Sequence, residues 1–534
     1  MPDLTLDRRA FLGRAAGAGV GALTALAPSA LAKQAVRGRK AIPLPSPAQV
    51  RRDVQRMVDF GARYTGTASH AGFVDWLERE LVRAGVVMYP RQQWPLTVWE
   101  AGDYGLEVLD GPAKGPVIVS GYVVRSQETG PAGVTGPLVY AGPAPVPALD
   151  TRGEGLAAAL EGYPAQVTSW AQGLSGMRGD LSGAIVLVDL PLPLPLPLAA
   201  LLTMSTYLQW PGRTAADWAT GDFKRTALLP ALNAPPPSTF GQRGAAAVVY
   251  CLDASAAAIK GGYMPFDADF DGTPGLWVDR DTGTKLRTAA ALRPSARLTL
   301  TATRRTATSD SLLGYLPGAA DLDEVLILNT HTDGEGFVEE NGGVALVQLA
   351  RHFGSLPRKR ALKRSLVFTL WPGHMAYGMP GIGGVKATHE DLFARAVAAI
   401  TVEHLGTTEW LDTADRGYHA TGDPEPMFAW TTQGPMFDLV REATIGAKLP
   451  RTALMRPPVQ FGVGSPFQSW GIPQAGLISG PYYMVNDAPG SDMDKLDERL
   501  AARQIAWVAD MIRRLDTADA AALRTGDPTL GAQL

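Results

Sequence analysis

The sequence predicts an α/β protein in which helices cover both faces of a central sheet. From about residue 311 onward, short apolar runs typical of strands alternate with segments of helical period. The strand-like runs are 324–329, 365–370 and 398–402, and the helical segments include 343–353 and 389–394. Such alternation is typical of βαβ units, which build a sheet with helices on both sides.

The length and composition indicate more than one folded part. A chain of 534 residues is too long for one hydrophobic core, because single cores stop growing near about 250–300 residues. Contents of 46% hydrophobic and 19% charged residues are those of an ordinary globular protein. Between residues 115 and 297, short Val- and Leu-rich strands alternate with Gly- and Pro-rich loops, which predicts a β-rich domain.

The first 32 residues have the pattern of a twin-arginine export signal. Arg8 and Arg9 precede a Gly- and Ala-rich apolar run, residues 15–26, and residues 30–32 form a small-x-small cleavage site. We therefore expect the mature chain to start at Lys33 and to be periplasmic or secreted. The apolar run is too short and too rich in glycine to span a bilayer, which needs about 18 or more apolar residues.

Charge and cysteine content exclude several kinds of partner. The formal net charge is −3, and no basic run with interleaved aromatic residues points to nucleic acid. Cys251 is the only cysteine, so the chain has no internal disulfide and no thiolate zinc site. Cys251 ends an apolar run, residues 245–251, and we expect it in a buried strand. We expect neither nucleic acid nor a membrane as partner.

The most informative stretch is 324–345, where polar residues follow an apolar strand. His331 and Asp333 stand at its end, Glu339 and Glu340 lie in the next loop, and Glu403 follows another predicted strand. The carboxyl ends of parallel strands share one sheet edge, where α/β proteins place ligands. Imidazole with carboxylate suits zinc and similar ions, and Asp333 is placed to hold the second ring N–H of His331. The loop also fits a purely structural role, as the cap of the following helix.

Several stretches follow an order known from one family. Residues 60–70 look like the Gly-x-Arg-x-x-Gly-Ser element that this family has near its N-terminus. Strands within 115–297 look like a domain inserted into the catalytic domain, and residues 313–318 are similar to the sequence that re-enters the catalytic domain after it. The chain resembles the exported zinc aminopeptidases and glutamate-carboxypeptidase-like proteins, a co-catalytic metallopeptidase family that also contains the transferrin receptor. The resemblance implies a phosphorylase/aminopeptidase-like central mixed sheet flanked by helices. It also implies a division into residues 33–114 and 298–534 for the catalytic-type domain and 115–297 for a protease-associated domain.

The resemblance also implies metal ligands, and the sequence keeps only one of the five in its original form. His331 falls on the first ligand. Glu340 falls on the position of the bridging aspartate, and Glu339 is the alternative there. Glu403 falls on the position of the fourth ligand, and His404 is an extra imidazole beside it. A longer carboxylate is still able to bind a metal.

Two ligand positions are lost, because Met375 stands at one and Tyr483 at the other. His374 occupies the place of the general base, and Asp487 follows Tyr483 as an outer residue. We therefore expect one zinc ion, or another divalent metal, rather than two. The expected ligands are His331, Glu340, Glu403 and His404.

These residues predict a metal-dependent hydrolase that cuts an amide bond in a small peptide or an N-acylated compound. In this hypothesis His374 takes the proton of the attacking water, and the Tyr483 hydroxyl donates to the developing oxyanion. The alternative is a catalytically inactive binding protein with the same scaffold, a route that the transferrin receptor exemplifies.

Overall fold

The computed structural model describes residues 41–145, 181–192, 197–223, 228–320, 322–457, 459–460, 462–486 and 489–525, with isolated positions between 166 and 173. All of them fall within one compact unit, Arg39–Leu534. The predicted export signal and Asp487 lie outside the described residues. None of the helices in the described part of the chain combines the length and apolarity that a bilayer crossing needs.

The central sheet is mixed, with the strand order β10-β12-β11-β13-β18-β16-β17-β7. Its middle strands run parallel: β12 (Ser365–Trp371), β11 (Val325–His331), β13 (Ala396–Val402) and β18 (Gln474–Ser479). β16 (Met427–Thr431) pairs antiparallel with β18. All residues of β11 and β13 are buried, as expected for strands that are covered on both faces. The predicted α/β class with a central mixed sheet is confirmed.

Alternate residues of the central strands pack against helices on opposite faces. Leu326 and Leu328 belong to the larger core, and Val325 and Ile327 to the smaller one. The larger core contains α1 (Pro47–Val58), α2 (Ala68–Ala84), α10 (Asn341–Gly354), α13 (Pro435–Ala447) and α15 (Glu498–Thr517). The smaller core contains α11 (Gly381–Thr388) and α12 (Glu390–Ala394).

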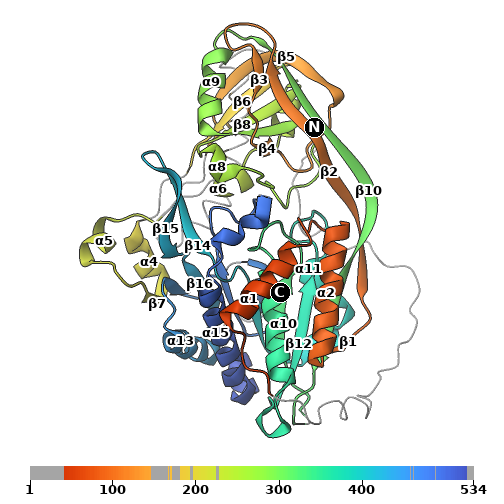
Figure 1. Ribbon diagram of the computed structural model, residues 1–534, viewed down its shortest axis with the longest axis vertical. Helices are drawn as coiled ribbons and strands as arrows, with labels where there is room; N and C mark the ends of the chain where they lie inside the picture. The colour runs from red at the N-terminus through yellow and green to blue at the C-terminus, as the bar shows by residue number, and fades with distance from the viewer. Residues whose placement is uncertain are drawn as a thin grey trace. The chain divides into compact units, whose positions relative to one another are not determined.

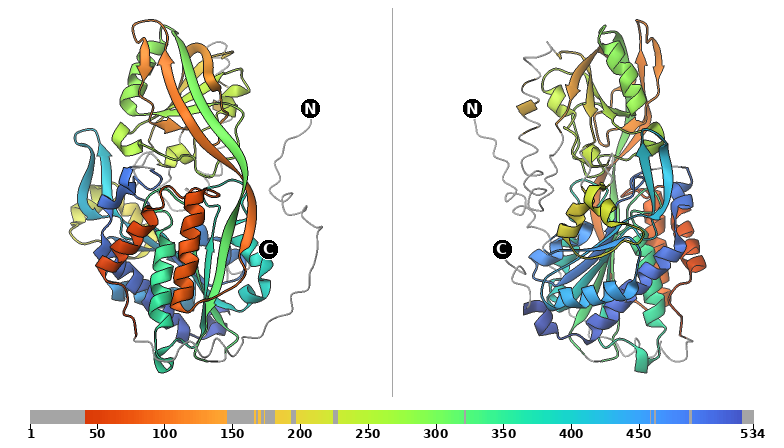
Figure 2. Two further views of the ribbon diagram at one scale, coloured as in Figure 1. Left: turned by 45° about the vertical axis from the view of Figure 1, so that its right-hand side comes forward. Right: turned by 90° about the vertical axis from the view of Figure 1, so that its left-hand side faces the viewer.

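One long strand joins the central sheet to the β-rich region. β10 (Ser295–Leu316) is 22 residues long; its last residues pair with β12 and its first with β5 (Gly130–Pro143). β2 (Gln92–Val108) runs antiparallel along most of β10. Figures 1 and 2 show this twisted two-stranded ribbon running from the β-rich region to the central sheet.

The β-rich region has its own small sheet, ordered β4-β9-β8-β6-β5-β10. Its strands include β4 (Gly121–Tyr122), β6 (Ile185–Leu190), β8 (Ala247–Leu252) and β9 (Gly275–Val278), and α9 (Arg280–Ala290) packs on one face. Cys251 is buried in β8, as predicted. Residues of the other face share a core with Met375 and Tyr482, which lie outside the β-rich region.

One strand from the range 115–297 leaves the β-rich region. β7 (Ser205–Gln209) pairs antiparallel with β17 (Thr452–Met455) at the edge of the central sheet. An edge strand offers unpaired backbone groups that another strand can satisfy. The hairpin of β14 (Thr408–Thr413) and β15 (Gly417–Pro424) forms a separate two-stranded sheet.

Candidate metal centre

The candidate site begins at His331, the last residue of β11. Its Nδ1 lies 3.0 Å from the backbone oxygen of Asp333. Because a carbonyl oxygen can only accept, we assign a ring hydrogen to Nδ1, so Nε2 is the nitrogen that remains for a metal. Burial lowers the pKa of His331, but the nearby carboxylates outweigh it and raise the pKa to about 9, so metal binding would displace the proton from Nε2. The predicted contact to Nδ1 involves the Asp333 carboxylate; in the structure the nearer acceptor is the Asp333 carbonyl oxygen, and Oδ1 lies 3.6 Å from Nδ1.

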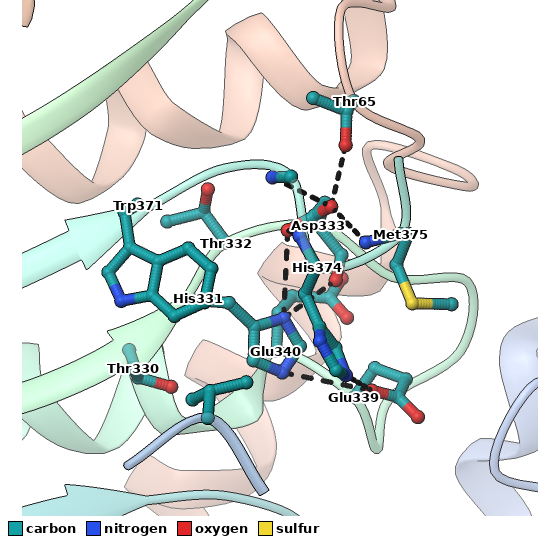
Figure 3. A network of polar contacts seen from close by, with 12 residues as sticks. Thr65, Thr330, His331, Thr332, Asp333, Glu339, Glu340, Trp371, His374 and Met375 are labelled. Atoms are coloured by element: carbon teal, nitrogen blue, oxygen red, sulfur yellow. Dashed lines mark hydrogen bonds and ion pairs between the residues drawn. The ribbon is translucent and has the colours of Figure 1, made fainter. Parts of the chain in front are cut away.

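The Glu339 carboxylate faces three imidazoles, and Figure 3 shows two of them, those of His331 and His374. Its Oε2 lies 3.7 Å from Nε2 of His331, 3.4 Å from Nε2 of His404 and 3.9 Å from Nε2 of His374. Oε2 of Glu403 lies 3.8 Å from Nε2 of His331. Ligand atoms arranged tetrahedrally at about 2.0–2.1 Å around zinc stand about 3.4 Å apart. The observed separations are therefore close to those around a single ion.

The inward-facing atoms of this cluster have no hydrogen-bond partner within the described chain. They are Nε2 of His331, both carboxylate oxygens of Glu339, Oε2 of Glu403 and Nε2 of His404. These four residues are at most 1% exposed. Buried polar groups without partners are costly and rare, and here they converge on one place. Imidazole nitrogens with carboxylate oxygens are donors that suit zinc and related divalent ions, so the cluster fits a metal.

The Asp333 carboxylate ties a second loop to this cluster. It accepts the backbone N–H groups of Gly373 at 3.1 Å and Met375 at 2.7 Å, and the Thr65 hydroxyl at 2.6 Å. Burial alone would raise the pKa of Asp333, but the adjacent His331 outweighs it and holds the pKa well below its usual range. These bonds bring His374 beside His331, with ring centroids 4.4 Å apart.

His404 comes from the loop after β13 and is held in an unusual backbone conformation. Its φ is +56°, in the left-handed region that non-glycine residues rarely adopt. Nδ1 donates to the Ser479 carbonyl oxygen at 2.6 Å, which directs Nε2 toward Glu339. Burial lowers the pKa of His404, but the Glu339 carboxylate outweighs it, so the net pKa is raised. Backbone strain of this kind gathers at functional sites.

Glu403 is fixed by the segment that follows β17. The backbone N–H of Val463 donates to its Oε1 at 3.2 Å. Gly462 has a φ of +66°, and a Cβ there would lie 2.2 Å from the same oxygen. Only glycine therefore allows this approach without displacement. Burial raises the pKa of Glu403 above its usual value.

The structure places two consecutive glutamates, Glu339 and Glu340, in the opposite of their predicted roles. Glu340 does not join the cluster, because its carboxylate is paired with the Arg63 guanidinium and both side chains are fully buried. Glu339, the alternative in the sequence analysis, faces the imidazoles instead. Sequence spacing does not decide between neighbours in a loop, since Arg63 lies far away along the chain.

Tyr483 does not have the catalytic position that its place in the sequence predicts. Its hydroxyl donates to the Thr408 carbonyl oxygen at 2.8 Å and accepts from the Thr408 N–H at 3.1 Å. The residue is 1% exposed and packs in the larger core. With both contacts made to backbone, the phenol is not available as an oxyanion donor.

His374 is the member of the cluster that reaches the surface, with 26% of its side chain exposed. Burial and the charge of His331 lower its pKa from 6.5 to about 4, so the ring is neutral at pH 7. Phe266 of the β-rich region lies beside it, with ring centroids 5.1 Å apart. The Arg125 side chain donates to the Met375 carbonyl oxygen at 2.6 Å, which fixes the loop next to His374.

Three residues of the stretch 60–70, for which the sequence predicts no role in the site, lie against it. Arg63, Thr65 and His70 all contact the loop after β11. His70 lies 2.9 Å from the Thr332 hydroxyl and 3.1 Å from that of Ser309. A buried Arg and a buried His in one short stretch are uncommon, but only the fold shows what they touch.

Comparisons with known proteins agree with this architecture. No family model and no curated protein matches the sequence. Among solved structures, a peptidase M28 precursor from Shewanella amazonensis is 17% identical with a TM-score of 0.60, covering 93% of this chain and 97% of that one. A zinc aminopeptidase from Bacillus subtilis is 15% identical with a TM-score of 0.56, covering 92% and 100%. An aminopeptidase from Aneurinibacillus sp. strain AM-1 is 16% identical with a TM-score of 0.54, covering 88% and 93%.

These likenesses establish a fold, since the identities are low. The chain has the fold of zinc-aminopeptidase-like hydrolases, as the resemblance implied. The role of each site residue comes from the geometry described above.

Proposed function

We propose that this protein is an exported metal-dependent hydrolase that cuts an amide bond in a small peptide or an N-acylated compound. The observation that carries the proposal is that His331 shares one set of candidate donors with Glu403 and His404 and a second set with Glu339 and His374. Five of these donor atoms are buried without a hydrogen-bond partner in the described part of the chain. The aminopeptidase-like fold supports the same reaction class. The twin-arginine pattern supports export, and the β-rich region is proposed as a protease-associated domain.

A single metal ion fits the donor atoms best. Two groups of three donors lie within 4.8 Å of one another, and both include His331. His331 offers only Nε2, because Nδ1 is bonded to the Asp333 carbonyl oxygen. One nitrogen lone pair binds one ion, so the two groups cannot each hold an ion through this residue. We therefore propose one zinc ion, or another divalent ion, held mainly by His331, Glu339, Glu403 and His404.

The chain's own residues supply the remaining parts of the reaction. Zinc supplies a Lewis acid that polarises a carbonyl group and makes water nucleophilic near neutral pH. His374, neutral and partly exposed, is placed to take a proton from the attacking water and return it to the leaving amine. Phe266 packs beside His374, with ring centroids 5.1 Å apart, and so helps to hold this imidazole in place.

The alternative of an inactive binding protein is not favoured. Loss of the metal would leave five donor atoms buried without partners, and selection for stability alone would replace such groups by apolar or paired residues. The departures from the family's ligands instead leave an imidazole at 374 and another at 404, both directed at Glu339.

The test measures metal content and hydrolysis in the mature, exported protein. We expect about one equivalent of metal by mass spectrometry, and cleavage within a panel of aminoacyl anilides and N-acyl amino acids. His404→Ala should lose both. His352→Ala is the matched control, because His352 contacts Ile42 and Arg513 on the far side of α10 and no cluster residue. Wild-type protein without metal, or equal effects of the two substitutions, would refute the proposal.

A further inference from the structure

Arg63 is a fully buried arginine whose side chain contacts both the loop of the candidate site and the segment before α2. Nε is paired with Glu340, and Nη2 donates to the carbonyl oxygens of Glu335 (3.2 Å) and Gly336. Nη1 donates to the carbonyl oxygens of Met57 (3.3 Å) and Gly61. One guanidinium therefore joins the segment before α2 to the loop that carries Glu339.

The backbone of Arg63 is bonded to the same loop. Its N–H donates to the Gly334 carbonyl oxygen at 2.8 Å, and the Gly334 N–H donates back at 3.3 Å. Gly334 leaves no space for a side chain, since a Cβ would lie 2.0 Å from Oε2 of Glu340 and 2.5 Å from Cβ of Glu339. The loop is thus closed tightly around both glutamates.

Glu339 and Glu340 are adjacent, equally buried and chemically identical, yet they face different partners. Glu339 meets the imidazoles and Glu340 meets Arg63. Arg63 holds the Glu340 carboxylate through Nε and two carbonyl oxygens of the same loop through Nη2, so it fixes the loop conformation that separates the two glutamates. Which of the two glutamates faces the imidazoles is therefore determined by Arg63, a residue outside the loop.

We propose that Arg63 is a positioning residue, which holds Glu340 and the carbonyls of residues 335 and 336 and so turns the Glu339 carboxylate toward the imidazoles. This inference rests on the proposed function, because it assigns Arg63 a part in metal binding. Groups that orient metal ligands from outside typically contribute about 10–100-fold to metal affinity.

The experiment compares the zinc affinity of full-length mature variants by competition with a chelator. Arg63→Gln should weaken zinc binding about 10–100-fold. Arg63→Lys should do the same, because an ammonium keeps the charge opposite Glu340 but cannot also reach both loop carbonyls. The double variant Arg63→Gln/Glu340→Gln should stay weak, and the absorption spectrum of bound cobalt should change in all three.

Arg451→Gln is the matched control, because Arg451 is also a buried, carboxylate-paired arginine (5% exposed) but belongs to the edge of the central sheet. Its zinc affinity should change by less than about threefold, since sites without shared partners act independently. Recovery of wild-type affinity in Arg63→Lys or in the double variant would overturn the proposal, since Arg63 would then only neutralise Glu340.

Folding measurements complete the test. If neither Arg63 variant folds while Arg451→Gln does, the role of Arg63 is structural and the proposal fails. If the wild-type protein binds no zinc, the proposed function itself is refuted, which is a different result from wild-type binding that Arg63→Gln leaves unchanged.

Discussion

Two buried groups of charged residues in this protein differ in whether the chain supplies hydrogen-bond partners for a buried carboxylate. Near the edge of the central sheet, the Glu409 carboxylate accepts from both terminal nitrogens of Arg451, each at 2.8 Å. At the carboxyl end of the middle strands, the Glu339 carboxylate is equally buried, yet neither oxygen has a hydrogen-bond partner within the described chain. The first carboxylate is satisfied by the protein, and the second is not.

The difference shows which observation identifies a site. Burial of a carboxylate by itself does not separate structure from function, because both carboxylates are buried. A carboxylate without a partner that faces imidazole nitrogens, which also lack partners, needs something the chain does not supply. The pair Glu409–Arg451 is therefore structural, and the cluster around Glu339 is the candidate for chemistry.

The largest effect is expected where the satisfied pair is broken. Arg451→Gln leaves Glu409 buried without its counter-charge, so the free energy of unfolding should fall by about 3–5 kcal/mol. Urea unfolding measures it. Arg304→Gln, which removes one partner of a partly exposed pair with Glu128, should cost less than about 1 kcal/mol. Equal losses of unfolding free energy in the two variants would show that the buried Arg451–Glu409 pair stabilises the fold no more than a partly exposed pair does.

Substitution of the unsatisfied carboxylate should act on metal and not on folding. Glu339→Gln should weaken zinc binding about 100-fold or more, since even outer groups contribute 10–100-fold. The metal-free protein should lose less stability than Glu409→Gln, because the Glu339 carboxylate makes no direct hydrogen bond within the described chain whereas Glu409 accepts two from Arg451. Glu409→Gln should show the reverse pattern, with lower stability and unchanged zinc affinity. Chelator competition measures the zinc affinity of both variants, and urea unfolding measures their stability. The same pattern in both variants would contradict the prediction.

A smaller effect is expected from acid. Burial lowers the pKa of His70 from 6.5 to about 4, so below about pH 6.5 the unfolded chain binds a proton that the folded protein does not. Stability is therefore unaffected by this residue above pH 6.5 and falls as the pH drops from there toward 4. Between pH 7 and 5, metal-free wild type should lose about 2 kcal/mol more than His70→Gln. Identical losses in urea unfolding would contradict the assignment.

The smallest effect concerns Tyr483. Tyr483→Phe removes the hydroxyl bonded to the Thr408 backbone and should reduce the free energy of unfolding by about 1 kcal/mol. Zinc affinity and kcat should not change. A large loss of kcat with little loss of stability would restore the oxyanion role that the sequence predicts for this tyrosine.

The sequence was a good guide wherever local pattern decides structure. The apolar runs at 324–329 and 398–402 form β11 and β13, because β-branched and aliphatic residues in short runs favour buried strands. Parallel strands then bring His331 and Glu403 to one sheet edge, 3.8 Å apart between Nε2 and Oε2. Both positions follow from periodicity and topology.

Contacts between segments that are distant along the chain could not be predicted from the sequence. The sequence predicts Glu340 rather than Glu339 as a ligand, because the pairing of Glu340 with Arg63 depends on the fold. It predicts Tyr483 as a catalytic residue, because the bond of Tyr483 to the Thr408 backbone also depends on the fold. It also treated 115–297 as one region, whereas β7 pairs with β17 of the central sheet.

The sequence by itself determined the α/β class and the placement of imidazoles and carboxylates after particular strands, since these depend on neighbours along the chain. Only the tertiary structure decided which of those side chains share one place without partners. That choice depends on groups hundreds of residues apart, such as Arg63 and Glu340, which folding brings into contact.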